Sequence, residues 1–143
     1  MKNLLVALDF HENESTLIDL VRELAEPLKA KVWFIHIAAP DPDFIGNKVG
    51  PQYIRDFRAE DLRKEHRQLQ EYATQFKEIG IDSEGLLIQG PTVETVLEEA
   101  SKLRIDMIIT GHEEHNFFYR AIYGSVSSGI MKGSKIPVLV VPY

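Results

Sequence analysis

The sequence predicts one α/β domain, residues 1–143, built on an open parallel sheet. Five short apolar segments alternate with four segments of helical periodicity, and such alternation is typical of parallel strands joined by right-handed helical crossovers. The apolar segments are short and continuous, as expected of strands that are buried on both faces. The chain has 44% hydrophobic residues and no cysteine, and at its length it can bury a full core without disulfides or structural metals.

The first two expected elements are a strand and an amphipathic helix. The run from Asn3 to Asp9 is apolar up to its final acid, which predicts a buried strand. Apolar residues then recur at i, i+3, i+4, i+7, i+8 and i+11 from Leu17 to Leu28, which predicts a helix. Glu12 and Glu14 lie near its start, where the helix dipole favours negative charge.

The next pair is a strand from Lys31 to Ile37 and a helix from about Pro51 to Ile79. β-branched and aromatic residues dominate the strand, and prolines follow it. The apolar positions of the helix are Leu62, Leu69, Tyr72, Ala73, Phe76 and Ile79. Mixed charges between Arg55 and Arg67 indicate a solvent-exposed face, and Gly80 is expected to end the helix.

The remaining elements continue the alternation. The segment from Ile81 to Gln89 reads as a third strand, and Gly90–Thr92 opens a third helix. Ile105–Thr110 is the expected fourth strand. A polar and aromatic segment follows, then a short helix from about Ile122 to Lys132 and a last strand from Ile136 to Val141.

The expected sheet predicts where a functional site lies. Ligands of open parallel sheets bind beyond the carboxyl ends of the strands, where the strand order reverses. Functional residues are therefore expected just after Asp9, Ile37 and Thr110. The fold class predicts the place of the site but not its ligand.

Charge and hydropathy disfavour several partners. The chain has 16 Lys and Arg against 22 Asp and Glu, a net charge of −6, so a nucleic-acid backbone would be repelled. The longest apolar runs, Leu4–Leu8 and Ile136–Pro142, fall far short of the ~20 residues that span a bilayer. We therefore expect a soluble, cytoplasmic protein with neither a nucleic-acid nor a membrane partner.

The segment from Thr110 to Ser125 is the most informative for function. Gly111 directly follows an expected strand, while Gly124 and Ser125 lie close to the start of the last helix. Main-chain N–H groups and the positive end of the helix dipole favour an anion there, and glycine lets the main chain approach it closely. A phosphate group is one candidate ligand, although glycines at helix starts are also turn and packing residues.

The same segment resembles the glycine motif of the universal stress protein family, whose ATP-binding members carry G-x2-G-x9-G-S/T after the fourth strand. Gly111, Gly124 and Ser125 match this motif, and Glu114 stands in the place of the second glycine. The resemblance covers the whole chain, at Val6–Phe10, His36–Ile37, Gly90–Pro91 and Ile136–Val141. It implies a five-stranded parallel sheet in the order 3-2-1-4-5, with helices on both faces, of the adenine nucleotide alpha-hydrolase-like class.

The resemblance also implies a nucleotide site and a function. The residues carried over to the nucleoside pocket are Ala7, Leu8, Asp9, Ile37, Thr110 and Gly111. Those carried over to the phosphates are Gly124, Ser125 and Val126. The implied function is a stress-response module that binds ATP or a related adenine nucleotide, with or without Mg²⁺, at the ends of strands one and four.

Glu114 opposes this function and leaves an alternative open. A carboxylate near a triphosphate repels it by on the order of 1 kcal/mol per charge in solvent. The side chain could instead point to solvent or hold a divalent cation that bridges to the phosphates. Because the family includes members with a degraded glycine motif and no nucleotide, the alternative is a dimeric interaction or regulatory protein of the same fold.

No catalytic residue and no metal site is predicted. The histidines of His112–His115 are spaced i, i+3, whereas a zinc protease helix needs i, i+4. Whether the protein is an enzyme stays open, since the sequence places no base for more than slow ATP hydrolysis. A P-loop, the acidic residues of a receiver domain and a flavodoxin phosphate loop are all missing from the strand ends.

The last strand predicts a second copy of the chain as partner. Ile136–Val141 is apolar and is expected at a sheet edge, without the charges that usually protect such edges from pairing. The resemblance likewise implies a homodimer through this strand. The alternative is that other parts of the same chain cover this edge strand.

Overall fold

The structure, a computed structural model, describes residues 1–38, 52–112 and 126–143, without the side chains of residues 52–57. Its elements are β1 (Asn3–Ala7), α1 (Glu14–Leu28), β2 (Lys31–Ala38), α3 (Gln52–Glu78), β3 (Ser83–Gln89), α4 (Thr92–Lys102), β4 (Met107–His112), α6 (Val126–Gly133) and β5 (Val138–Pro142). The predicted alternation of strands and helices is confirmed.

The strands form one parallel sheet in the order β3-β2-β1-β4-β5, which confirms the predicted class and order. β1 lies in the middle, where Ala7 pairs with Ile35 of β2 on one side and with Thr110 of β4 on the other. The strand order therefore reverses between β1 and β4. Because every strand runs in the same direction, all five strands have their carboxyl ends on the same side of the sheet, which we call its carboxyl edge.

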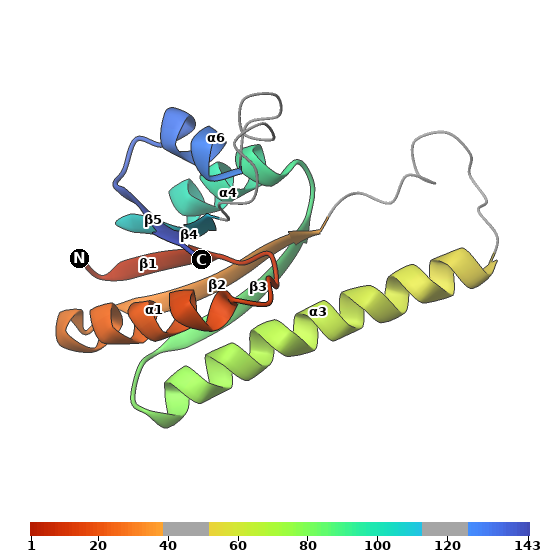
Figure 1. The fold of residues 1–143 in the computed structure, drawn as a ribbon, viewed down its shortest axis with the longest axis horizontal. Helices are drawn as coiled ribbons and strands as arrows, with labels where there is room; N and C mark the ends of the chain where they lie inside the picture. The colour runs from red at the N-terminus through yellow and green to blue at the C-terminus, as the bar shows by residue number, and fades with distance from the viewer. Residues whose placement is uncertain (39–51, 113–125) are drawn as a thin grey trace.

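Helices cover both faces of this sheet (Figure 1). α1 and α3 pack on one face, and α4 and α6 pack on the other. Neighbouring residues of a strand point to opposite faces, so Phe34 belongs to the cluster under α1 and α3 while Ile35 belongs to the cluster under α4 and α6. Both side chains are fully buried, as the continuous apolar run of β2 predicted.

Several predicted strand boundaries are wrong by two residues: β1 ends at Ala7 and not at Asp9, β3 begins at Ser83 and not at Ile81, and β4 covers Met107–His112 and not Ile105–Thr110.

Two further boundaries shift for local reasons. Ile79 was expected on the buried face of its helix but lies just beyond α3 and is 49% exposed, because the chain turns at Gly80, where φ is +87°. The last strand begins at Val138 rather than at Ile136. Ser134 Oγ donates to the carbonyl of Ile136 and accepts from its N–H, at 2.7 and 3.1 Å, which holds a turn before the strand.

The contact between α3 and β3 is unusually close at one glycine. A Cβ atom at Gly85 would lie 2.9 Å from the Cβ of Leu69 and 3.0 Å from its carbonyl oxygen. Two residues away, Ser83 Oγ donates to the carbonyl of Ala73 at 2.9 Å. The strand therefore meets the backbone of the helix, and this contact fixes the height of α3 above the sheet.

Candidate functional site

A cavity of about 180 Å³ lies at the carboxyl edge of the sheet, at the point where the strand order reverses. Seven of the ten residues predicted for nucleotide binding line it: Ala7, Leu8, Asp9, Ile37, Thr110, Gly111 and Val126. The other three, Glu114, Gly124 and Ser125, lie outside the described residues. The topology thus brings residues that are far apart in the sequence to one cavity.

The local geometry of β1 and β4 explains this convergence. Ala7 and Thr110 are paired across the two strands, and just beyond them the main chain of Leu8 still donates to the carbonyl of Ile35 at 2.8 Å. Ile35, Ile37 and Val96 supply an apolar floor, while Asp9, Thr92 and Thr110 supply polar groups around it. An apolar floor with a few polar groups is typical of small-molecule sites.

Asp9 lies at the mouth of the cavity and is exposed. Its Oδ1 accepts a hydrogen bond from the main chain of His11 at 3.1 Å, across Phe10, whose φ of +59° lies in the left-handed region. Asp9 therefore stabilises a sharp turn after β1 through one oxygen.

Tyr143 lines the cavity and was not among the residues predicted for the site. A Cβ atom at Gly111 would overlap the Cζ and Oη atoms of Tyr143, so the glycine makes room for the phenol ring. The ring stacks on His11 with centroids 4.6 Å apart and planes 3° from parallel. Its hydroxyl donates to Asp9 Oδ1 at 3.4 Å. The strand order could have indicated Tyr143, since the residue after β5 lies at the carboxyl ends of the strands, where the site was predicted.

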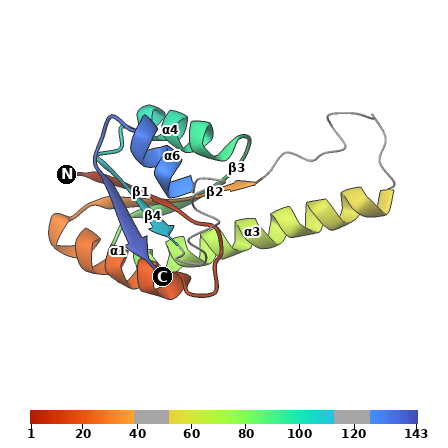
Figure 2. The ribbon, with the colours of Figure 1, turned by 45° about the horizontal axis from the view of Figure 1, so that its top comes forward.

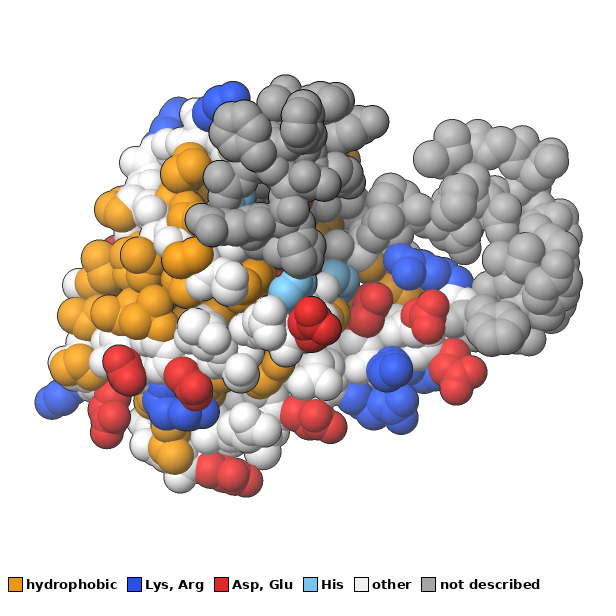
Figure 3. Space-filling view, viewed as in Figure 1, with side chains coloured by type: hydrophobic (Ala, Val, Ile, Leu, Met, Phe, Trp, Pro, Cys, Tyr) orange, Lys and Arg blue, Asp and Glu red, His pale blue; other side chains and the backbone are white. Residues whose placement is uncertain are grey.

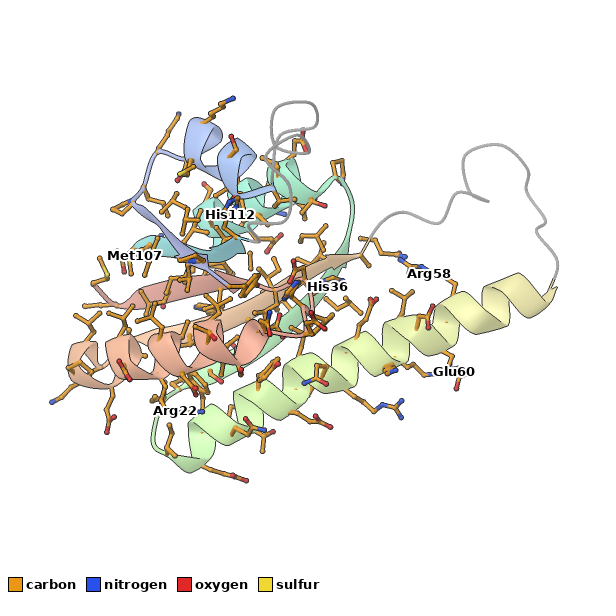
Figure 4. All side chains as sticks on the ribbon, viewed as in Figure 1. Arg22, His36, Arg58, Glu60, Met107 and His112 are labelled. Atoms are coloured by element: carbon orange, nitrogen blue, oxygen red, sulfur yellow. The ribbon has the colours of Figure 1, made fainter. Side chains whose placement is uncertain are left out.

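His36, labelled in Figure 4 at the end of β2, borders the cavity, but its imidazole points to the opposite face of the sheet from Ile35 and Ile37, toward α3. Its Nδ1 lies 2.7 Å from the carbonyl oxygen of Leu8, and because a carbonyl can only accept, Nδ1 carries the hydrogen. The Nε2 atom then faces Glu65 Oε2 of α3 at 3.7 Å. His36 thereby connects the main chain of the site to the long helix on the other face.

A second cavity, of about 590 Å³, lies between residues 10–14 and α3. Glu14 lies in its wall and is 3% exposed; its Oε1 accepts from the N–H of Phe10 at 3.0 Å and its Oε2 accepts from the Tyr72 hydroxyl at 2.8 Å. Burial raises the pKa of the Glu14 carboxyl above its ordinary value. Burial, together with the neighbouring carboxylate, also raises the pKa of the Tyr72 phenol.

Glu14 and Glu65 are carboxylates near the site that the sequence analysis missed. Glu14 was expected only to complement the helix dipole, because helical periodicity does not show that α3 covers the start of α1. Glu65 lies within a densely charged helical segment that was assigned to solvent. Contacts between elements far apart in the sequence bring both carboxylates close to the carboxyl edge of the sheet.

His112 ends β4, and its Nδ1 lies 3.3 Å from the hydroxyl of Ser127 on α6. The other histidine of the pair, His115, lies outside the described residues. Over residues 1–38, 52–112 and 126–143, no group of three His, Asp or Glu side chains is placed to hold a metal ion. Across the same stretches, no helix has the length and apolar character that crossing a membrane requires.

Comparisons with known proteins agree on one family. The family model described as the universal stress protein family matches residues 1–142. The stress response protein NhaX of Bacillus subtilis is 31% identical over 134 residues, which cover 93% of this chain and 75% of NhaX.

Two solved structures share the fold. A universal stress protein in complex with cAMP has a TM-score of 0.71 and 20% identity, covering 99% of this chain and 96% of its own. A universal stress protein family protein of Arabidopsis thaliana with AMP bound has a TM-score of 0.69 and 17% identity, covering 99% and 92%. At these identities the structures establish the common fold, which confirms the sheet class predicted from the sequence.

Proposed function

The chain belongs to the universal stress protein family, and from this premise we propose that it is a stress-response module that binds an adenine nucleotide. The observation that carries the proposal is the convergence of Asp9, Thr110 and Gly111 on one cavity with an apolar floor. The nucleotides in the two related structures, cAMP and AMP, support an adenine nucleotide as the ligand class.

The chemistry of the cavity suggests an orientation for the nucleotide. Ile37 and Val96 offer apolar surface to the base, and Asp9 offers carboxylate oxygens that accept hydrogen bonds from ribose hydroxyls. We assign the phosphates to Gly124, Ser125 and Val126, at the start of α6. There main-chain N–H groups and the helix dipole would favour negative charge.

Glu114 affects which adenine nucleotide is favoured. A carboxylate close to the phosphates repels ATP more than AMP, because ATP carries more negative charge. We therefore propose that ATP binds together with Mg²⁺, which offsets this repulsion, and that AMP binds without a cation.

We assign no catalytic residue. We further propose a cytoplasmic location for the protein and one functional domain over residues 1–143.

Isothermal titration calorimetry tests this function. The wild-type protein is titrated with AMP and with ATP, the latter with and without Mg²⁺, alongside Glu114→Gly and Gly124→Val. We expect Glu114→Gly to bind ATP about fivefold more tightly, since losing on the order of 1 kcal/mol of repulsion changes affinity by that factor. Gly124→Val is expected to abolish binding, because its side chain would block the approach of phosphate to the main chain.

Glu113→Gly is the matched control, because it removes the same charge next to the motif position. If it improves ATP binding as much as Glu114→Gly, the effect is one of general charge and not of the motif. If the wild type and Glu114→Gly bind none of the nucleotides, the nucleotide proposal is wrong.

A dimeric interaction protein without nucleotide is the second candidate. Two observations favour it: Tyr143 covers Gly111, and the cavity of about 180 Å³ is smaller than the roughly 300–1,000 Å³ of ordinary ligand sites. β5 supports a homodimer through Ile136–Val141, since it is the edge strand and its Val138, Leu139 and Val140 are only half-buried. Figure 3 shows hydrophobic side chains gathered on that part of the surface.

A further inference from the structure

We propose that a cavity at the amino ends of β4 and β5 binds a small organic anion with an apolar tail, of which a medium-chain carboxylate is the simplest example. The cavity lies between the ends of α4 and α6, whereas the site proposed for the nucleotide lies at the starts of these two helices. The inference therefore goes beyond the proposed function and does not depend on it.

The cavity has the size of a ligand site. It measures about 440 Å³, within the roughly 300–1,000 Å³ of ordinary small-molecule sites. Its walls come from the last turns of α4, the start of β4 and the connection from α6 to β5. All of its lining residues fall within 97–108 and 133–136, inside the described parts of the chain.

The apolar half of the lining is part of the core on this face of the sheet. Ala100, Ile105 and Ile108 are buried. Leu97 and Ile136 are half-buried, where this core opens to solvent. A hydrocarbon tail in contact with these side chains would leave water, which favours binding in proportion to its length.

The charged part of the lining is basic, although the chain as a whole is acidic. The net charge of the chain is −6, yet Arg104 and Lys135 line the cavity and no carboxylate is found among its described lining residues. Within the described part of the chain, neither cation forms an ion pair with a carboxylate.

Two acids close to Arg104 in the sequence are engaged elsewhere. The carboxylate of Asp106 accepts from two main-chain N–H groups near the start of the chain, at 2.7 and 2.8 Å. The carboxylate of Glu99 pairs with Lys102 at 3.2 Å. The charge presented to the cavity is therefore positive, and a ligand carboxylate complements it through charge-assisted hydrogen bonds.

The main-chain positions of the two cations are set by hydrogen bonds. The N–H of Ile105 donates to a carbonyl of α4 at 2.9 Å, which closes the turn that contains Arg104. Ser134 Oγ accepts from the N–H of Ile136 at 3.1 Å and donates to its carbonyl at 2.7 Å, which fixes the turn that contains Lys135. Connections that are already ordered lower the cost of binding.

Isothermal titration calorimetry with octanoate tests the site. We expect octanoate to bind, and hexanoate to bind about tenfold more weakly because two fewer methylene groups leave water. Octan-1-ol, which has the same tail without the charge, should also bind about tenfold more weakly. If octanoate does not bind at millimolar concentrations, or if octan-1-ol binds as tightly, the proposal is wrong.

Arg104→Gly separates binding from folding. Arg104 has a φ of +54°, a conformation that glycine adopts without steric cost, so the variant should unfold at the same urea concentration as the wild type or a higher one. Its affinity for octanoate should fall about tenfold, because the guanidinium is lost.

Lys29→Gly is the matched control. Lys29 is an exposed cation with a φ of +52° at the end of α1, remote from the cavity, and this variant should bind octanoate like the wild type. If both glycine variants lose the same affinity, the attraction comes from overall charge and the proposed site is wrong. Unchanged binding by Arg104→Gly would also overturn it.

A bulky substitution locates the bound ligand. Ser101 is an exposed residue that lines the cavity, and Ser101→Trp should abolish octanoate binding by filling the space. Glu98→Trp, at an exposed position of the same helix outside the lining, should bind octanoate at least as tightly as the wild type. If Ser101→Trp still binds octanoate, or if both tryptophan variants lose it, the ligand lies elsewhere and the proposal fails.

Discussion

At the scale of single residues, Glu14 is the clearest case of a group whose chemistry depends on its surroundings. Its carboxyl is buried between Phe10 and Tyr72, and burial raises its pKa from the ordinary value of 4.5. The folded state therefore keeps the Glu14 proton over a pH range in which the unfolded state has lost it. The stability that this proton confers is complete below the unfolded pKa and is lost as the pH rises through the folded pKa.

We predict that Glu14→Gln removes this pH dependence. The amide of glutamine has the same shape and can bond to both partners, because Oε1 accepts from Phe10 and Nε2 donates to the Tyr72 oxygen, which reverses the direction of the second bond. Relative to this variant, the wild type should lose stability as the pH rises above about 4.5, until the raised pKa is passed. Urea unfolding at a series of pH values measures the difference.

Glu12→Gln is the control for this prediction, since Glu12 is exposed and only two residues away. Its stability should follow that of the wild type over the whole pH range. Parallel pH profiles for the wild type and Glu14→Gln would contradict the burial of Glu14 beneath Tyr72.

At the scale of elements, the packing of α3 on β3 depends on Gly85. We predict that Gly85→Ala lowers the free energy of unfolding by about 1–3 kcal/mol, as overpacking typically does. The added methyl would press against the Cβ and the backbone of Leu69, and a backbone contact cannot be relieved by a change of rotamer. Urea denaturation measures the loss, with Glu84→Ala at the exposed neighbouring position as control.

An equal stability of Gly85→Ala and Glu84→Ala would mean that α3 can move outward at little cost. In that case the rigidity ascribed to the contact between this helix and the sheet would be wrong.

The elements themselves could be predicted from the sequence because their signals are local. The apolar period of the helix around Leu69 and Phe76, and the stop at Gly80, depend on residues within a few positions of one another. The start of β5 was missed because the turn at Ser134 depends on two side-chain hydrogen bonds. A serine before an apolar run does not reveal these bonds.

The candidate site could be predicted only in part, for a related reason. Asp9, Ile37 and Thr110 were expected together because strand ends meet in any parallel sheet of this order. Glu14 and Tyr143 were not expected, because their roles arise from contacts with Tyr72 and Gly111. These contacts join residues that lie 58 and 32 positions apart, and no local pattern encodes them.

At the scale of the whole molecule, the proposed homodimer depends on β5. It is the edge strand next to β4, and Figure 2 shows it at the front of the molecule, on the outer side of the sheet. A half-buried apolar edge tends to pair with another strand. The proposed homodimer follows from this position.

We predict that Val140→Lys converts the proposed homodimer to a monomer, because a charged side chain on an edge strand opposes pairing. Val140 is half-buried, so the lysine can reach solvent in the monomer and the fold should persist. Sedimentation analysis measures the mass, and circular dichroism checks the fold. Thr74→Lys, which adds the same charge at an exposed position of α3, should leave the mass unchanged.

A wild-type protein that sediments as a monomer would reject pairing through β5. If Val140→Lys and the wild type sediment as the same dimer, the two copies meet through another surface.

The length of α3 has a mechanical consequence. Its 27 residues span about 40 Å, whereas the eight residues of β2 span about 26 Å, and Figure 1 shows the first half of the helix reaching past the sheet. The close contact between Leu69 and Gly85 is the point about which the helix would tilt. Since residue 52 lies about 25 Å from Leu69 along the helix, a tilt of about 5° there would displace that far end by about 2 Å. A small adjustment at the sheet would therefore produce a larger displacement at the far end of the helix.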